Sequence, residues 1–252
     1  MDPVRAIAGI GLNVADVARA SALYRALGFA DGGGSGAGAR LTFGGFVLDL
    51  TAATGAAYPA PRAANDPWFQ HFAIAVADIA AAAEIALAAG ATPISHGGPQ
   101  LLPPNTGGVT AWKFRDPGGH PLELSLIPGS RWLSEARPGQ VFLGIDHTAL
   151  AVADLAASQA WYEARGFREV GRSLNTGPEQ DRLDGLAGVA VDIVALASAA
   201  GGPHLELLGY RSPRPAPARP VGDGDVAATR TLIVGGSGEN DPDGHRLSAW
   251  RP

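Results

Sequence analysis

Short apolar runs alternate with helical patterns along this chain, and this alternation recurs several times. IAGIGLNV, FAIAVA and IDHTALAV each read as a short β-strand, and each run ends close to an aspartate. An aspartate there can cap a following helix by accepting a backbone N–H. The helical patterns that follow stop at glycines, as left-handed C-caps require. The glycines are Gly28, Gly90 and Gly166.

Two of the strand patterns have almost the same eight residues. HFAIAVAD begins at His71 and HTALAVAD begins at His147. Each is followed later by an apolar run that holds one glutamate, PLELSL around Glu123 and HLELLGY around Glu206. A strand–helix unit followed by more strands cannot cover both faces of its own small sheet, so we expect such units to pair.

Two weaker copies of the unit flank the complete ones. In the first copy Gly9 stands at the histidine position and Asp49 at the glutamate position. In the last copy Thr229 stands at the histidine position and Ser248 at the glutamate position. This copy also lacks the helix and the middle strands. Linkers rich in proline and glycine separate the copies. The sequence therefore predicts modules at 1–51, 65–128, 141–210 and 225–252, with linkers 52–64, 129–140 and 211–224.

Composition sets broad limits on partners. With 252 residues, 46% of them hydrophobic, the chain can bury one large or two small cores. A net charge of −5 gives no basic face for nucleic acid or anionic lipid. The longest apolar stretch, near residues 79–91, is interrupted by Glu84 and does not predict a membrane span. Without cysteine or a signal-peptide pattern, we expect a cytoplasmic protein.

The repeated segments carry a resemblance to a known family. The βαβββ repeats, ALYRALGF, AWYEARGF and DPGGHPLELS resemble the vicinal-oxygen-chelate superfamily of glyoxalases, bleomycin-resistance proteins and extradiol dioxygenases. The resemblance implies an α+β fold in which tandem βαβββ modules pair into two half-open eight-stranded barrels, the second pair truncated. It also implies a concave face that holds a divalent metal or a ligand, and its members differ in function.

The pairing of modules decides the expected ligand set. If modules 2 and 3 share a barrel, the cavity receives His71, Glu123, His147 and Glu206, a set that resembles bacterial-type glyoxalase I. Two imidazoles and two carboxylates suit an ion of Ni, Co, Fe, Mn or Zn. If modules 1 and 2 pair instead, the set is Asp49, His71 and Glu123. We favour the pairing of 2 with 3, because it uses all four good ligands, although each could also be a core residue or an ion-pair partner.

The first functional hypothesis is a metal-dependent, glyoxalase-like isomerase or lyase that acts next to a carbonyl of a small metabolite. Glu123 or Glu206 would be the catalytic base. Glutathione-specific relatives have an arginine four residues after the first-strand histidine, where this chain has Ala75 and Ala151. The resemblance therefore implies a substrate other than glutathione. An extradiol-type dioxygenase is the alternative enzyme, and a monomer or a homodimer is consistent with four modules.

The second hypothesis is a metal-free binding protein of the bleomycin-resistance type. Aromatic side chains would then line the cleft around a small molecule, or else pack in the core. The candidates are Trp68, Phe69, Trp112, Phe114, Trp132 and Tyr210. The remaining histidines stand next to glycine or proline and are interpreted as turn or rim residues. They are His96, His120, His204 and His245.

Overall fold

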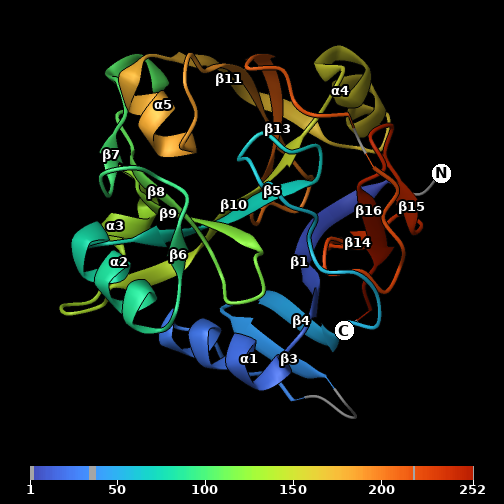
Figure 1. Ribbon diagram of the computed structural model, residues 1–252, viewed down its shortest axis with the longest axis horizontal. Helices are drawn as coiled ribbons and strands as arrows, with labels where there is room; N and C mark the ends of the chain where they lie inside the picture. Colours follow the sequence, from blue (N-terminus) through green and yellow to red (C-terminus); the bar gives the residue numbers. More distant parts are fainter. Residues whose placement is uncertain (1–2, 34–37, 218, 252) are drawn as a thin grey trace.

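The computed structural model describes residues 3–33, 38–217 and 219–251. Residues 1–2 and 34–37 of the predicted first module, residue 218 of the linker 211–224 and residue 252 of the predicted last module lie outside these ranges. Two mixed sheets with helices packed around them make up the described chain (Figure 1). The helices are α1 (Val17–Ala26), α2 (Ile79–Ala88), α3 (Arg131–Ser134), α4 (Leu155–Glu163), α5 (Pro178–Asp184) and the 3-10 helix η1 (Pro104–Thr106).

The larger sheet is built from the two complete repeats. Its strand order is β11-β12-β13-β10-β5-β9-β8-β6, and β7 also pairs with β8. The strands are β5 (Phe69–Val76), β6 (Thr92–Pro93), β7 (Gln100–Leu101), β8 (Thr110–Arg115), β9 (Pro121–Leu126), β10 (Phe142–Ala151), β11 (Arg168–Thr176), β12 (Ala190–Ala197) and β13 (His204–Ser212). It has nine strands rather than eight, because the short β6 and β7 pair with opposite ends of β8.

The smaller sheet joins the first and last parts of the chain. Its strand order is β15-β16-β14-β1-β4-β3-β2. The strands are β1 (Val4–Val14), β2 (Ala30–Asp31), β3 (Ala39–Phe43), β4 (Phe46–Ala52), β14 (Arg230–Gly235), β15 (Glu239–Asn240) and β16 (Arg246–Ala249). Within the described residues the last repeat contributes three strands and no helix. The α+β fold with one truncated pair is therefore confirmed, and the sheets pair the repeats as the sequence favoured.

The local signals for helices are confirmed. The side chains of Asp16, Asp78 and Asp154 each accept the backbone N–H three residues later, at 2.9–3.0 Å. Gly28, which follows α1, has a φ of +95°, a conformation that residues with a Cβ rarely adopt.

Strand register corrects one position in the last repeat. In the two complete repeats, the residue opposite the glutamate lies two residues after the histidine. In the last repeat Leu232 pairs with Ser248, so the histidine position belongs to Arg230. The assignment of Thr229 to this position is wrong by one residue, because Val234 is followed by Gly235 and Gly236 and the V-A-D triplet that aligns the other copies is missing here.

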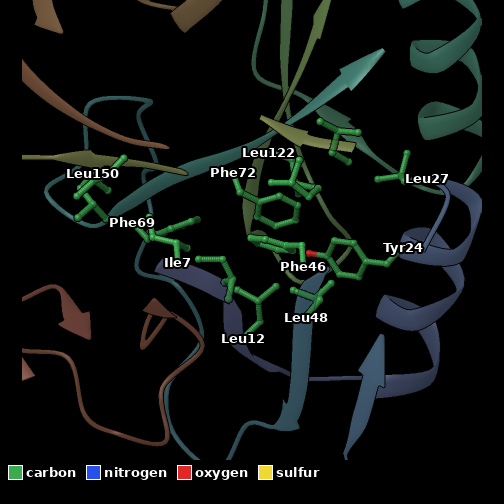
Figure 2. Close-up of a cluster of buried hydrophobic side chains, with 14 of the residues drawn as sticks. Ile7, Leu12, Tyr24, Leu27, Phe46, Leu48, Phe69, Phe72, Leu122 and Leu150 are labelled. Carbon is green, nitrogen blue, oxygen red and sulfur yellow. The ribbon is translucent and has the colours of Figure 1, made fainter. Parts of the chain in front are cut away.

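A shared hydrophobic core lies between the two sheets (Figure 2). Ile7, Leu12 and Leu48 of the smaller sheet belong to the same buried cluster as Phe72 and Leu122 of the larger one. Side chains alternate between the faces of a strand, so the neighbours of Phe72 and Leu122 point away from this core. The candidate ligands on β5 and β9 therefore lie on the other face of the larger sheet. Among the described helices, none is long and apolar enough to cross a membrane.

Candidate metal centre

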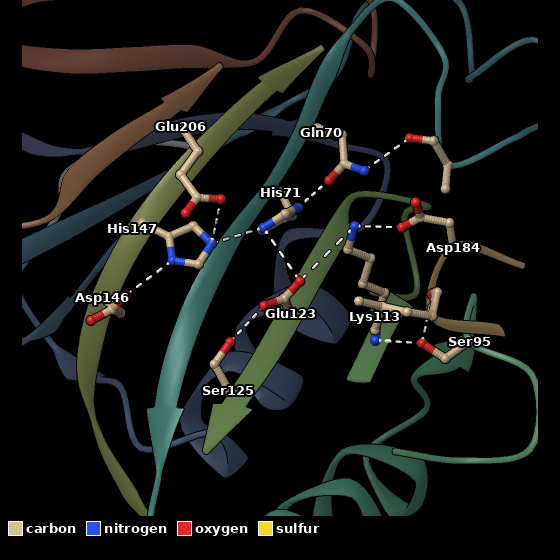
Figure 3. A network of polar contacts seen from close by, with 12 residues as sticks. Gln70, His71, Ser95, Lys113, Glu123, Ser125, Asp146, His147, Asp184 and Glu206 are labelled. Carbon is tan, nitrogen blue, oxygen red and sulfur yellow. Dashed lines mark hydrogen bonds and ion pairs between the residues drawn. The ribbon is translucent and has the colours of Figure 1, made fainter. Parts of the chain in front are cut away.

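Four adjacent strands bring the four predicted ligands together. His71 lies on β5, Glu123 on β9, His147 on β10 and Glu206 on β13, and their side chains point toward one another (Figure 3). The Nε2 atoms of the two histidines are 3.0 Å apart. His71 Nε2 lies 3.6 Å from Glu123 Oε2, and His147 Nε2 lies 3.6 Å from Glu206 Oε2. Asp49, the ligand expected from the alternative pairing, lies in the smaller sheet and forms an ion pair with Arg40.

The four side chains line one cavity of about 720 Å³, including its open mouth. His71, Glu123 and His147 expose 6% of their surface or less. The rest of the wall is mixed. Leu102, Val109, Ile127 and Ile193 supply apolar surface, and Thr106, Ser173, Asn175 and Gln180 supply polar groups. Such a cavity, with charge at one point and mixed walls, suits a small polar metabolite.

A β-bulge stands next to each histidine and supplies its hydrogen-bond partner. The register between β5 and β10 shifts at Gln70 and again at Asp146, so each is an extra residue in its strand. The side chain of Gln70 contacts Nδ1 of His71, and Oδ2 of Asp146 accepts Nδ1–H of His147 at 3.0 Å. Both contacts leave Nε2 facing the other ligands, the usual arrangement behind metal-binding histidines.

Gln70 is neutral and Asp146 is charged, and the pKa values of the two histidines differ accordingly. Burial lowers the pKa of His71 well below its ordinary value, and the nearby Lys113 and His147 add to this shift. Burial also opposes the charge of His147, but Glu206 and Asp146 outweigh it and raise the pKa to about 9. His147 is therefore the imidazole that holds a second proton more readily, and His71 is the one that gives it up more readily.

The pKa values of Glu123 and Glu206 also differ. Burial raises the pKa of Glu123, although the charges of Lys113 and His147 oppose this shift. For Glu206 burial acts in the same direction, but His147 and His204 outweigh it and lower the pKa to about 2. Glu123 is therefore the carboxylate that takes up a proton more readily.

Sequence reasoning missed a buried lysine at this site. Lys113 pairs in register with Glu123, and its Nζ lies 2.6 Å from Asp184 Oδ1 and 4.0 Å from Glu123 Oε2. The side chains of Lys113 and Asp184 are at most 4% exposed. A lysine in the apolar strand TAWKFR was the available signal, because a buried charge calls for a partner.

The ligand atoms have spacings that fit a divalent cation. Ligands about 2.1 Å from an ion lie about 3.0 Å apart along the edges of an octahedron and about 3.4 Å apart in a tetrahedron. The observed separations of 3.0 and 3.6 Å are close to these values. The atoms of His71, Glu123 and His147 all lie within 4.8 Å of one another. These residues can hold an ion after small movements of their side chains.

The other predicted residues lie elsewhere. His96 is exposed, and His204 lies beside Glu206 with its Nε2 3.4 Å from Oε1. His120 and His245 lie at the ends of the turns before β9 and β16, as the interpretation as turn or rim residues allowed, but they are buried and do not lie on a rim. Their rings face backbone carbonyls of neighbouring segments, at Val226 and Ala151.

The predicted aromatic lining is not found around the central cavity. None of the six aromatic candidates is among the described residues that line it. Trp112 and Phe114 stack on each other inside the core, because their positions alternate with Lys113. Trp132 and Tyr210 contact residues behind the site instead, at Asp146 and Asp184.

Part of the amino-acid sequence matches a known protein family. Residues 6–124 match the Glyoxalase/Bleomycin resistance protein/Dioxygenase superfamily. This part of the chain is therefore similar to that superfamily. Comparison with curated proteins gives no sequence match.

Solved structures of the superfamily's fold resemble nearly the whole chain. Glyoxalase I from Zea mays is 22% identical, with a TM-score of 0.59, and the match covers 84% of this chain and 70% of the maize chain. A putative dioxygenase from Bacillus subtilis is 16% identical, with a TM-score of 0.54, and the match covers 96% and 72% of the two chains. At these identities the likeness establishes the superfamily fold and leaves function to the site.

Proposed function

We propose that this chain is a metal-dependent enzyme of the glyoxalase type that moves a proton next to a carbonyl of a small metabolite other than glutathione. The convergence of two imidazoles and two carboxylates in one cavity is the observation that supports it. His71, Glu123, His147 and Glu206 would hold the ion. A bound divalent cation would supply Lewis-acid activation of a carbonyl or hydroxyl oxygen pair.

Within this proposal Glu123 carries the proton. Its Oε1 accepts a hydrogen bond from Ser125 at 2.6 Å, and its Oε2 lies 4.0 Å from Lys113 Nζ. These two partners can hold the carboxylate when it turns from the ligand position toward a substrate C–H. Outside the proposed ligand set, the comparable partner of Glu206 among the described residues is His204, at 3.4 Å. We therefore assign Glu206 mainly to ligation and Glu123 to proton transfer at Oε2.

Metal content is the first test. Wild-type protein, His71→Ala and Glu206→Ala are purified without chelator, and bound metal is measured by mass spectrometry. We expect stoichiometric divalent metal in the wild type and at least a tenfold loss of affinity in both variants. His96→Ala is the matched control, since this histidine is exposed, and it should keep the metal. A wild type that binds no divalent metal under any loading condition would overturn the proposal.

Proton transfer is tested separately. Hydroxyacetone serves as a probe with acidic hydrogens next to its carbonyl, and their exchange in D₂O is followed by NMR. Glu123→Gln should lose exchange by roughly 10²–10⁴-fold, the usual contribution of a positioned base. Oxygen uptake with catechol is measured alongside. Uptake without exchange would favour the extradiol-type dioxygenase instead.

One observation favours a metal-free binding protein as the second candidate. Lys113 already places a positive charge beside Glu123, so part of the carboxylate charge is balanced without any ion. In that case His71→Ala and Glu206→Ala would keep their affinity for the ligand, and purified protein would contain no stoichiometric metal.

A further inference from the structure

A second, narrower pocket lies beside the candidate metal centre. It is bounded by the linker before β5 and by β8 and β9, and Arg62, Asp66, Trp68, Gln70, Lys113 and Arg115 are among its lining residues. Its interior has room for little more than one water-sized group. Lys113 also lines the cavity of the metal centre, so this side chain forms part of the wall between the two spaces.

Two of the three cations around this pocket are paired. Arg62 Nε lies 3.3 Å from Asp66 Oδ2, and Lys113 Nζ lies 2.6 Å from Asp184 Oδ1. Among the described residues, no carboxylate lies within 4.0 Å of the Arg115 guanidinium. The Nε atom of Arg115 is buried and has no hydrogen-bond partner among the described residues. Of these three cations, Arg115 is therefore the one without a direct ion-pair partner among the described residues.

The surroundings of Arg115 make this charge costly. Burial lowers the pKa of Arg115, and the neighbouring Arg62 adds to the shift, while the more distant carboxylate of Asp66 opposes it without forming an ion pair. Arg115 is partly buried, and a charge that is partly removed from water without a close counter-charge still destabilises the folded state. The indole Nε1 of Trp68, which also lines the pocket, is buried without a hydrogen-bond partner. A small anion could accept hydrogen bonds from these two unpaired donors and supply the counter-charge that Arg115 lacks.

Arg62 is held in place before any ligand binds. Its guanidinium lies 3.6 Å above the ring of Tyr58 and donates from Nη1 to the carbonyl of Gly119 at 3.1 Å. A cation fixed by stacking and hydrogen bonding loses little conformational entropy on binding an anion. The linker that carries both Tyr58 and Arg62 thus contributes one side of a prebuilt site.

We propose that the pocket between Arg62, Arg115 and Trp68 is a binding site for a small inorganic anion of the size of chloride. The ligand would accept from the Arg115 guanidinium and balance its charge, and the narrow interior excludes larger organic anions. This site is separate from the proposed metal centre and does not depend on it.

Thermal unfolding of the full chain tests the proposal. Sodium chloride is varied against sodium gluconate at constant ionic strength, because gluconate is too large for the pocket. A ligand that binds only the folded state raises Tm with concentration, and we expect a rise of about 2–4 °C in chloride. Arg115→Gln should remove the chloride dependence. Arg137→Gln, at an exposed arginine, is the matched control and should keep it.

A second measurement does not depend on how well a variant folds. In wild-type crystals soaked in sodium bromide, an anomalous peak is expected beside the Arg115 guanidinium. Identical Tm values in chloride and gluconate, together with no bromide peak, would mean that only water fills the pocket. Either a peak at Arg115 in the crystals or a chloride effect lost specifically in Arg115→Gln supports the site.

Discussion

At the scale of single residues, Lys113 shows how strongly this site depends on paired charges. Its ammonium lies between Asp184 and Glu123 in a region with almost no solvent contact. Asp184 is also the acceptor for the Gln180 amide and the Tyr210 hydroxyl. Removing one member of a buried ion pair leaves the other charge unbalanced, which usually costs more than replacing both.

Lys113→Met should therefore lower the free energy of unfolding by about 3–5 kcal/mol. Urea denaturation followed by circular dichroism measures the loss. The double variant Lys113→Met with Asp184→Asn is the control, since it removes both charges, and it should recover much of the stability. If the single variant lost less than about 1 kcal/mol, the ion pair would not be a major stabilising contact.

A pH dependence follows from Asp116, a buried carboxylate in the turn between β8 and β9. Burial raises its pKa, but the charge and hydrogen bonds of His120, together with the Tyr24 hydroxyl, outweigh this effect and hold the pKa below its usual value. A carboxyl with a lowered folded pKa stabilises the protein above its unfolded pKa near 3.9, and this stability is lost as the pH falls further.

Asp116→Asn should consequently flatten the loss of stability below about pH 4. The free energy of unfolding is compared between pH 7 and pH 3 for the wild type and the variant. The exposed Asp31 provides a control as Asp31→Asn, which should retain the wild-type slope. An equal slope for Asp116→Asn and the wild type would contradict a lowered pKa at this position.

Residue identities at the site were only partly predictable. The repeated HxAxAVAD pattern located His71 and His147, and the apolar strands located Glu123 and Glu206. The partner of Lys113 was not predictable, because Asp184 is 71 residues away and reaches the site from α5, outside the repeated motif. Gln70 and Asp146 precede the histidines in the sequence, yet alternation places them on the opposite face unless a bulge is known.

At the scale of elements, glycine permits the close approach of β1 and β4. A Cβ on Gly9 would lie 2.0 Å from the carbonyl oxygen of Val47, well inside the contact distance of real side chains. The neighbouring position, Gly11, is covered by the Arg230 guanidinium, whose Nε would lie 3.0 Å from a Cβ there. The smaller sheet therefore has no space for a histidine side chain at Gly9.

Gly9→Ala should destabilise the protein by about 3 kcal/mol, because the added methyl must push apart two backbones. Thermal unfolding gives the change. Gly171→Ala on β11 is the control, since a Cβ there meets its nearest neighbour, Ala195, at an ordinary 3.8 Å. A Tm for Gly9→Ala within 1 °C of the control would mean that the two strands separate easily.

Elements were predicted unevenly. Aspartate caps and terminal glycines placed α1, α2 and α4 correctly, because those signals are local. The split of one strand position into β6 and β7 was not predicted, since both are two residues long and depend on pairing with β8. The same holds for Arg230, whose position follows from the register of β14 with β16.

At the scale of the whole molecule, the two sheets are joined by corresponding contacts. The Tyr24 hydroxyl of α1 donates to Asp116 at 2.8 Å, and the Tyr162 hydroxyl of α4 donates to Asp241 at 3.0 Å. Each contact links a helix of one sheet to a turn of the other, and all four residues are buried. The similar segments DPGGH and DPDGH therefore serve the junction between sheets rather than the ligand cavity.

Because these contacts and one hydrophobic cluster cross the junction, we expect the two sheets to unfold together. Native-state hydrogen exchange in low urea should give the amides of Leu48 on β4 and Leu124 on β9 the same free energy of opening. Tyr24→Phe removes a hydrogen bond to a charged group and should lower both values by the same amount, about 1.5–3 kcal/mol. If the sheets were independent, the variant would leave one value unchanged, and the amides of the truncated sheet would open at a lower free energy than those of the sheet that carries the candidate metal centre.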